Sequence, residues 1–207
     1  MVRPGVAESV STSRRDARRD RIRNHVLDAT VRCCQRRGVS AIGMSDIAAE
    51  AKIGRATLYR HFENFEEVLV ALIGREMDEL LAELTTVIGS FETIEDKLIE
   101  PTVYFLREVS RSPVLRMLFA QDAQLIGRVA MRAAEFRALG AAFCRPVFEQ
   151  AMREGRIRPG ITLDQYQEWI ARLQVSLGFN PHADQNDSIR FRQYLRNFLV
   201  PSVFIPT

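Results

Sequence analysis

The sequence predicts an all-α protein, with a small N-terminal helix-turn-helix domain of three helices and a larger helical domain after it. Apolar residues recur every three or four positions along most of the chain, which is the period of an amphipathic helix. No alternating run typical of a β-strand appears, and the sequence contains no internal repeat. The 207 residues, 46% of them apolar, suffice for one large domain or for a small domain plus a larger one.

The first predicted helix covers residues 14–37. Gly38 ends it, because glycine readily adopts the left-handed conformation of a C-terminal cap. We expect no regular structure in residues 1–13, which show no helical periodicity. The helix-turn-helix domain is expected in residues 14–65 and the larger domain in residues 66–207. The apolar side chains that share the buried face of the first helix are Ile22, Val26, Ala29 and Cys33.

Two short helices joined by a tight turn are the most informative feature of the chain. The first carries apolar residues at the i, i+3, i+4 and i+7 positions from Met44, and the second carries the pair Leu58 and Phe62. Residues 52–54 form the turn between them. Helices this short bury too little apolar surface to fold alone. The arrangement is typical of a helix-turn-helix, whose second helix enters the major groove of DNA.

The remainder of the chain is predicted to be helical, with segments separated by proline, glycine and asparagine. Asn64 and Asp187 are positioned as N-caps, and Thr162 with Gln165 forms a capping box. The predicted helices span residues 65–87, 94–110, 114–120, 123–154, 163–179 and 188–200.

Positive charge is concentrated in the N-terminal part of the chain. Residues 1–62 contain 13 Lys and Arg against 6 Asp and Glu, a net charge of +7, whereas residues 63–207 contain 16 against 20, a net charge of −4. The densest basic run, residues 14–23, has a net charge of +4. This asymmetry favours a nucleic-acid partner for the first part, although basic residues are also common on solvated helices.

Several classes of protein are disfavoured by the sequence. No apolar run is long enough to cross a membrane, and the first residues lack a secretory signal, so we expect a cytoplasmic protein without a membrane partner. No catalytic motif, cofactor motif or cluster of metal ligands appears, so we expect no enzyme, no cofactor and no metal site. Packed thiols are the expected role of the cysteines, with a redox sensor as the alternative, at Cys33, Cys34 and Cys144.

The chain contains VLDATVRCCQRRG at residues 26–38 and MSDIAAEAKIGRATLYRHFENFEEVL at residues 44–69. Together these segments resemble the N-terminal domain of the tetracycline-repressor (TetR) family of bacterial transcriptional regulators, and the resemblance covers residues 20–72. It implies a homodimeric repressor that binds a pseudo-palindromic operator in double-stranded DNA and responds to a small-molecule effector. Beyond residue 72 the resemblance is architectural, because the C-terminal domains of the family diverge.

The second short helix offers side chains suited to reading DNA. Arg55 stands at its N-terminus, which enters the groove most deeply, and can pair bidentately with guanine. Thr57 can contact a thymine methyl group or a polar base edge, and Ala56 permits a close approach. The resemblance implies phosphate contacts from Tyr59 and His61. The full set of expected DNA-binding residues is Ser45, Lys52, Arg55, Ala56, Thr57, Tyr59, Arg60, His61, Arg18 and Arg19.

The chain departs from the family pattern at four positions. Lys52 replaces a glycine and must adopt the geometry of the turn, unless the turn itself differs. Gly54 stands where serine is common, and Cys34 stands where phenylalanine is usual. Phe65 replaces a lysine that binds phosphate in the family. Either Lys52 or the basic residues 14–23 are expected to supply the missing charge.

The resemblance further implies that the last two long helices form a four-helix bundle with those of a second copy. Apolar stripes with a spacing of three and four residues support this interpretation, and an intramolecular core is the alternative. The expected interface residues are Leu163, Tyr166, Ile170, Leu173, Leu177, Tyr194, Leu195 and Phe198.

A cavity for the effector is also implied by the resemblance, and apolar residues of the larger domain are candidates to line it. Few charges fall among them, so we expect a largely apolar or aromatic ligand. A close-packed core is the alternative for each residue. An architectural DNA-binding or thiol-switch protein, whose second domain binds nothing, is the competing interpretation of the whole chain. The expected pocket residues are Phe105, Phe119, Phe143 and Trp169.

Overall fold

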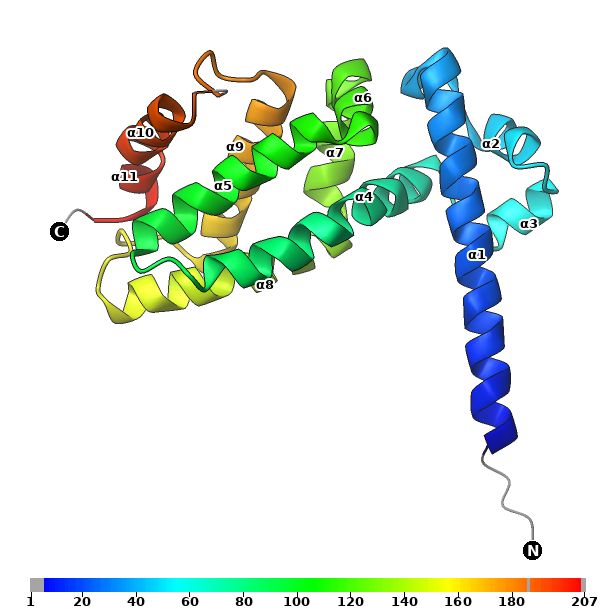
Figure 1. The fold of residues 1–207 in the computed structure, drawn as a ribbon, viewed down its shortest axis with the longest axis horizontal. Coiled ribbons are helices and arrows are strands. Elements are labelled where there is room, and N and C mark those ends of the chain that lie inside the picture. The colour runs from blue at the N-terminus through cyan, green and yellow to red at the C-terminus, as the bar shows by residue number, and fades with distance from the viewer. Residues whose placement is uncertain (1–5, 186, 206–207) are drawn as a thin grey trace, which may run out of the picture. The chain divides into compact units, whose positions relative to one another are not determined.

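The computed structural model describes residues 6–185 and 187–205 and is helical (Figure 1). Within these residues it contains no strand, only an isolated bridge between Ile157 and Phe204. The predicted all-α class is therefore confirmed. The chain forms two compact units, Met1–Leu72 and Ile73–Thr207.

The first unit contains the three predicted helices and the start of a fourth. Its first helix begins at Val6, whereas we expected irregular chain up to residue 13, and residues 1–5 lie outside the described residues. An established helix extends readily, because each added residue also adds a hydrogen bond. The elements that begin in this unit are α1 (Val6–Arg37), η1 (Val39–Ala41), α2 (Met44–Glu50), α3 (Arg55–Tyr59) and α4 (Phe65–Ile88).

The two short helices bury their apolar sides in the core of this unit. Leu58 and Phe62, the pair predicted for the second short helix, are 0% and 1% exposed. α3 ends at Tyr59, earlier than predicted, but the backbone N–H of Phe62 still donates to the Leu58 carbonyl at 3.0 Å. Cys34 is fully buried where phenylalanine is usual. The division between the two compact units falls inside α4, whose first turns bury Val68, Leu69 and Leu72.

Left-handed residues end α1 and α2. Gly38 closes α1 with a φ of 82°, as predicted. Lys52 has a φ of 53°, so it adopts the turn geometry in place of glycine. Its N–H donates to the Ala49 carbonyl, and the N–H of Ile53 donates to the Ala48 carbonyl, both at 3.1 Å. These two bonds form a Schellman cap, in which glycine is the usual left-handed residue.

Ion pairs join α1 to α2. Glu50 accepts from Arg32 at 2.7 Å and also from Arg36, and Asp46 accepts from Arg37 at 2.5 Å. Hydrogen bonds from Arg36 and Arg32 lower the pKa of Glu50 to about 2. Several arginines of α1 are therefore committed to holding α2 in place.

The helix caps predicted from the sequence are present. The Asn64 side chain accepts from the backbone N–H of Glu67 at 2.9 Å at the start of α4. Thr162 and Gln165 form the predicted capping box. Asp187 accepts from two backbone N–H groups of the helix that it precedes, both at 3.1 Å.

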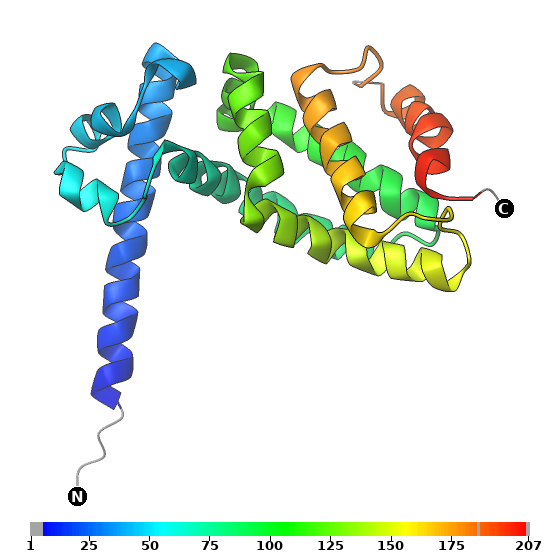
Figure 2. The same cartoon turned by 180° about the vertical axis from the view of Figure 1, so that it is seen from behind.

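The second unit differs from the predicted helix list at two breaks. Ala133 is extended, with a ψ of 127°, so the helix predicted for residues 123–154 is two helices. The last predicted helix ends at Phe198 and a short helix follows. Figure 2 shows the unit from behind, with α8 packed against α9. Its further elements are α5 (Ile94–Arg111), α6 (Pro113–Gln121), α7 (Ala123–Arg132), α8 (Ala134–Arg153), α9 (Leu163–Phe179), α10 (Ser188–Phe198) and α11 (Val200–Val203).

Replacing Lys52 by glycine is expected to stabilise the protein. A side chain in the left-handed region costs roughly 1–2 kcal/mol, and glycine removes that cost while losing some chain entropy on folding. Denaturant unfolding of Lys52→Gly should show a free energy of unfolding about 1 kcal/mol above that of the wild type. Lys52→Ala, which keeps a Cβ in the same backbone conformation, should show no such gain. A glycine variant that unfolds more easily than the wild type would contradict the strained turn.

Acid should weaken the packing of α2 against α1. The pKa of Glu50 is lower in the folded chain than its ordinary value of 4.5, so its contribution to stability is present above pH 4.5. That contribution is lost as the pH falls from about 4.5 to about 2. The free energy of unfolding of Glu50→Gln should therefore depend less on pH in this window, as measured by denaturant titrations. Gln35→Ala, at an exposed and uncharged side chain of α1, should keep the wild-type slope.

Candidate nucleic-acid interface and ligand cavity

The side of α3 that faces away from the core is open to solvent. Arg55, Ala56 and Arg60 are exposed, Tyr59 is 53% exposed, and Thr57 is partly exposed. Leu58 faces inward between them. A helix exposed in this way, with a basic residue at its N-terminus, presents the side chains that a DNA groove can accept.

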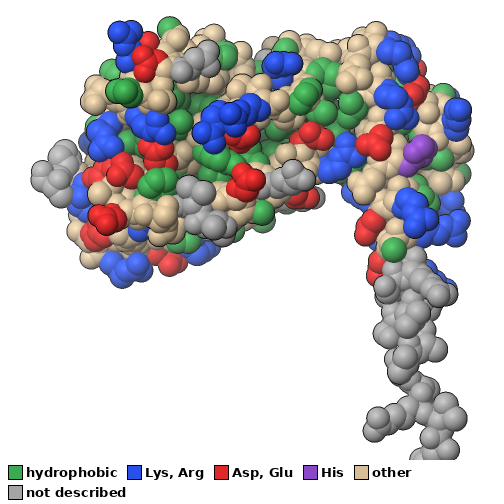
Figure 3. All heavy atoms as spheres, in the orientation of Figure 1, with side chains coloured by type: hydrophobic (Ala, Val, Ile, Leu, Met, Phe, Trp, Pro, Cys, Tyr) green, Lys and Arg blue, Asp and Glu red, His purple; other side chains and the backbone are tan. Residues whose placement is uncertain are grey.

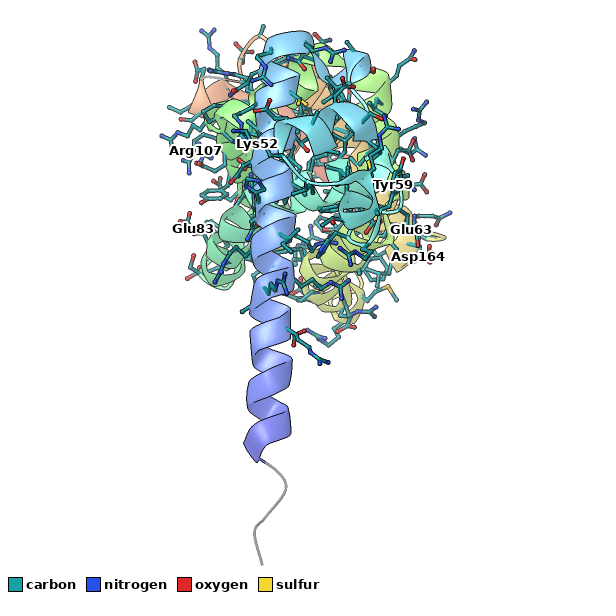
Figure 4. The ribbon with its side chains drawn as sticks, turned by 90° about the vertical axis from the view of Figure 1, so that its right-hand side faces the viewer. Lys52, Tyr59, Glu63, Glu83, Arg107 and Asp164 are labelled. Atoms are coloured by element: carbon teal, nitrogen blue, oxygen red, sulfur yellow. The ribbon has the colours of Figure 1, made fainter. Side chains whose placement is uncertain are left out.

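The turn and the start of α2 add two more exposed polar side chains. Ser45 lies in the first turn of α2, and Lys52 lies in the turn before α3. Figure 4 labels Lys52 and Tyr59, and both reach the surface of the first unit. Figure 3 shows that Lys and Arg side chains are numerous over the described surface of this unit. The exposed set therefore matches a surface that meets phosphate.

Thr57 and Arg60 contact each other on the exposed side. A terminal nitrogen of Arg60 donates to the Thr57 hydroxyl oxygen at 3.0 Å. The hydroxyl proton of Thr57 remains available for donation to another acceptor. This pairing orients Thr57 along the helix surface.

Arg23 of α1 holds the end of α3. It donates to the backbone carbonyl of His61 at 2.6 Å, its guanidinium lies 4.2 Å from the centre of the Phe62 ring, and Glu67 is 3.9 Å away. The basic run of residues 14–23 alone does not predict this structural role of Arg23. Its position three residues before buried Val26, on the same side of α1, was the available signal.

His61 lies in a cationic neighbourhood. Its Nδ1 atom is buried without a hydrogen-bond partner among the described residues. Burial, followed by the charges of Arg19, Arg23 and Arg60, lowers the pKa of His61. The imidazole is therefore neutral at pH 7, and the positive charge beside the end of α3 comes from arginines. Arg18 and Arg19 are both exposed on α1, and Arg19 is the one that influences His61.

The cysteines are poor candidates for a redox switch. Cys33 and Cys34 are 3% and 0% exposed. Burial raises the pKa of Cys33, raises that of Cys34 to about 11 and raises that of Cys144 to about 12. Because the thiolate is the reactive form, these thiols are expected to be inert at neutral pH.

The residues expected at a dimer interface differ in their exposure within one protomer. α9 packs against α8, α5 and α7, and α10 packs against α5. Phe198 is 65% exposed, and Leu163, Leu173 and Tyr194 are partly exposed. The residues buried within the protomer are Tyr166, Ile170, Leu177 and Leu195.

A cavity of about 1170 Å³ lies within the second unit, among α4 to α9. Phe105, Phe119 and Phe143 contribute to its lining. Trp169 does not, because its ring is 45% exposed and its indole N–H donates to the Ser202 hydroxyl at 2.9 Å. The apolar residues of this unit therefore do not close into a fully packed core.

The described helices include none with the length and apolar character to cross a membrane.

Two solved structures share the fold of this chain. RolR, solved with resorcinol, has a TM-score of 0.65 at 20% identity and covers 91% of this chain and 90% of its own. FadR from Bacillus subtilis, solved with stearoyl-CoA, has a TM-score of 0.56 at 17% identity and covers 86% of this chain and 95% of its own. At these identities the likeness concerns the fold.

Sequence relatives extend the comparison. Residues 26–72 match the family described as bacterial regulatory proteins, tetR family. The chain is 31% identical over 181 residues to the HTH-type transcriptional regulator Rv1255c of Mycobacterium tuberculosis. The aligned region covers 87% of this chain and 84% of that protein. The protein therefore belongs to the TetR family of bacterial transcriptional regulators, and its relatives are regulators of transcription rather than enzymes.

Proposed function

We propose that the protein is a homodimeric repressor that binds a pseudo-palindromic operator in double-stranded DNA and is released by a small, largely apolar ligand. The observation that carries the proposal is the exposed, basic side of α3, held on a core that buries its other side. A two-fold dimer presents two such helices, which suits half-sites about one helical turn apart or somewhat more.

Base reading is assigned to the N-terminal part of α3. Arg55 is exposed there and can pair with guanine, and Thr57 keeps a hydroxyl proton that suits an acceptor on a base edge. Ala56 is exposed and small, which permits close approach to the groove. Contacts to the phosphate backbone of DNA are assigned to Ser45 and Lys52. Tyr59, Arg60 and His61 are assigned to the same backbone as a group.

Arg19 is our candidate for the phosphate contact that Phe65 cannot make. Phe65 opens α4 and carries no charge. Arg19 is exposed, and its charge reaches His61 at the end of α3. Arg18 adds charge on the same exposed helix. Lys52, in the turn at the other end of α3, is the competing candidate.

Dimerisation is assigned to the surfaces of α9 and α10 that remain open. Phe198 and Ile189 are 65% and 81% exposed, which is high for large apolar side chains. Leu163, Leu173 and Tyr194 are partly exposed and can contribute at the edge. Burial of such side chains against a second copy would remove apolar surface from water.

The cavity supports an effector, and its aromatic lining supports an apolar one. The neighbouring folds RolR and FadR were solved with resorcinol and stearoyl-CoA, respectively. A ligand releases DNA only if it binds the released arrangement of the protein better than the DNA-bound arrangement. A tenfold difference in affinity corresponds to about 1.4 kcal/mol per site. The cavity and the buried thiols both weigh against an architectural or thiol-switch protein.

Arg55→Ala is expected to relax the sequence preference at one base position. A good bidentate contact is worth about 1–3 kcal/mol of discrimination. Binding-site selection with the purified wild type would define the operator, and the variant would then be titrated against operators substituted at each position. Tyr59→Phe should instead weaken all sequences to a similar extent. Unchanged selectivity in Arg55→Ala would show that α3 reads the groove in another register.

Arg19→Ala should make operator binding less dependent on salt. Each phosphate contact contributes about 0.9 to the slope of log affinity against log salt, so two subunits should lose about 1.8. The preferred operator should stay the same, because phosphate contacts carry no sequence information. Lys52→Ala is the parallel variant, and Arg116→Ala in α6 is the control. A slope that falls only with Lys52→Ala would assign the contact to the turn.

Phe198→Glu combined with Ile189→Glu should give a folded monomer. Both side chains are exposed, so the charges meet water in the monomer and an apolar surface only in the dimer. Sedimentation velocity at micromolar concentration should show a dimer for the wild type and half its mass for the variant. Met152→Glu, at another exposed apolar side chain, is the control. A dimeric double variant would place the interface elsewhere.

A further inference from the structure

The part of the cavity wall formed by α4 and α5 is mainly apolar, but it includes the charged side chain of Lys97. α4 and α5 contribute mainly apolar side chains, and Lys97 is the one charged residue among the described lining residues of these two helices. From Lys97 to Phe105, the lining of α5 extends over about 12 Å. The apolar lining residues beside this stretch include Met77, Leu84, Leu98, Phe143 and Val147.

Among the described residues, Lys97 has no partner of opposite charge, unlike the acidic residues beside it on α5. Its ammonium is partly buried and donates to the side-chain oxygen of Gln150 at 2.8 Å, and no carboxylate of the described residues lies within 4.0 Å. In contrast, three acidic residues close to it in the sequence of α5 are each paired with an arginine. These pairs are Glu95 with Arg156, Asp96 with Arg196 and Glu100 with Arg192.

Burying an ammonium without a counter-charge costs free energy, and one of the three donors of Lys97 has a partner among the described residues. A lysine can also line a wall with its stem and send its charge into water. In this structure, however, the ammonium is turned to an amide oxygen of α8, which carries no net charge. The amide nitrogen of Gln150 donates in turn to Glu154 at 2.8 Å, so the amide is held in this orientation.

The remaining charges of the lining lie on α7, α8 and α9. Arg172 is paired with Glu168 at 2.5 Å, so these two compensate each other. Arg128 and Arg137 also have interaction partners of their own. Lys97 is therefore the lining cation that favours a negatively charged ligand.

We propose that the effector is an amphipathic organic anion, whose apolar body lies along α4, α5 and α8 and whose negative head group binds the Lys97 ammonium. This inference rests on the proposed function, in which the cavity takes an effector. The carboxylate of an organic acid has the chemistry that the site requires, since it offers the counter-charge and accepts the free donors of Lys97.

Three probes with one apolar chain separate the contributions of head group and chain. Decanoate, decanol and decylammonium would be titrated calorimetrically into the full-length protein below their aggregation concentrations. Decanoate should bind at least about tenfold more tightly than decanol, since a charge-assisted hydrogen bond is worth roughly that factor. Decylammonium should bind most weakly of the three.

Lys97→Met keeps the apolar stem and removes the charge. It should weaken decanoate binding about tenfold or more, and should leave decanol binding within about twofold of the wild type. Lys97→Arg should retain the preference for decanoate. Arg153→Met is the matched control, because Arg153 is exposed on α8 and does not line the cavity. Thermal unfolding of each variant checks that the fold is kept.

Equal affinities for decanoate and decanol, or an unchanged decanoate affinity in Lys97→Met, would overturn the anionic head group. The proposed release by an apolar ligand would survive that result if decanol weakened operator binding. If none of the three probes bound, the inference would also be overturned. If decanoate bound through Lys97 without changing operator affinity, the site would stand and the proposed release would fail.

Discussion

The position of α3 depends on the contacts of its buried side with the core of the first unit. α3 is five residues long, and a helix of that length does not persist in water because too few hydrogen bonds repay its nucleation. Leu58 and Phe62 supply the anchor by burying nearly all of their surface in the first unit. Arg23 adds a second hold, on the backbone carbonyl of His61. The exposed side of α3 is available for DNA because the buried side fixes the helix.

The same need for anchoring divides the basic residues of α1 into two groups. Toward its C-terminal end, Arg32, Arg36 and Arg37 are paired with acidic residues of α2. These arginines stabilise the packing of α1 against α2, and carboxylates of α2 compensate their charges. Farther back, Arg18 and Arg19 are exposed and make no ion pair among the described residues. The positive charge of the first 62 residues therefore overstates what is available for phosphate.

The second unit leaves a space among its helices that its own side chains do not fill. Its helices bury many apolar side chains, yet a cavity of about 1170 Å³ remains among α4 to α9. The ion pairs between α5 and later segments, such as Glu100 with Arg192, tie the wall to the outer helices. Lys97 is not part of these ion pairs, because its ammonium is bound by the neutral amide of Gln150. A ligand can therefore supply the negative charge that Lys97 lacks.

The sequence by itself determined the helical class, the helix-turn-helix and the caps at Asn64, Thr162 and Asp187, because periodicity and capping act over a few residues. It also marked Lys52 as the residue that must take a glycine's geometry. Helix breaks were less predictable, since the extended Ala133 has no proline or glycine to mark it.

Only the tertiary structure decided which partner each apolar face meets. A three- and four-residue stripe has the same chemistry whether it packs in a core, against a second copy or around a cavity. The structure shows that Tyr166 and Leu195 are buried within the protomer and that Trp169 lies outside the cavity. It also shows the bond from Arg23 to the His61 carbonyl and the bond from Lys97 to Gln150. Those outcomes depend on contacts between residues far apart in the chain, which local pattern does not encode.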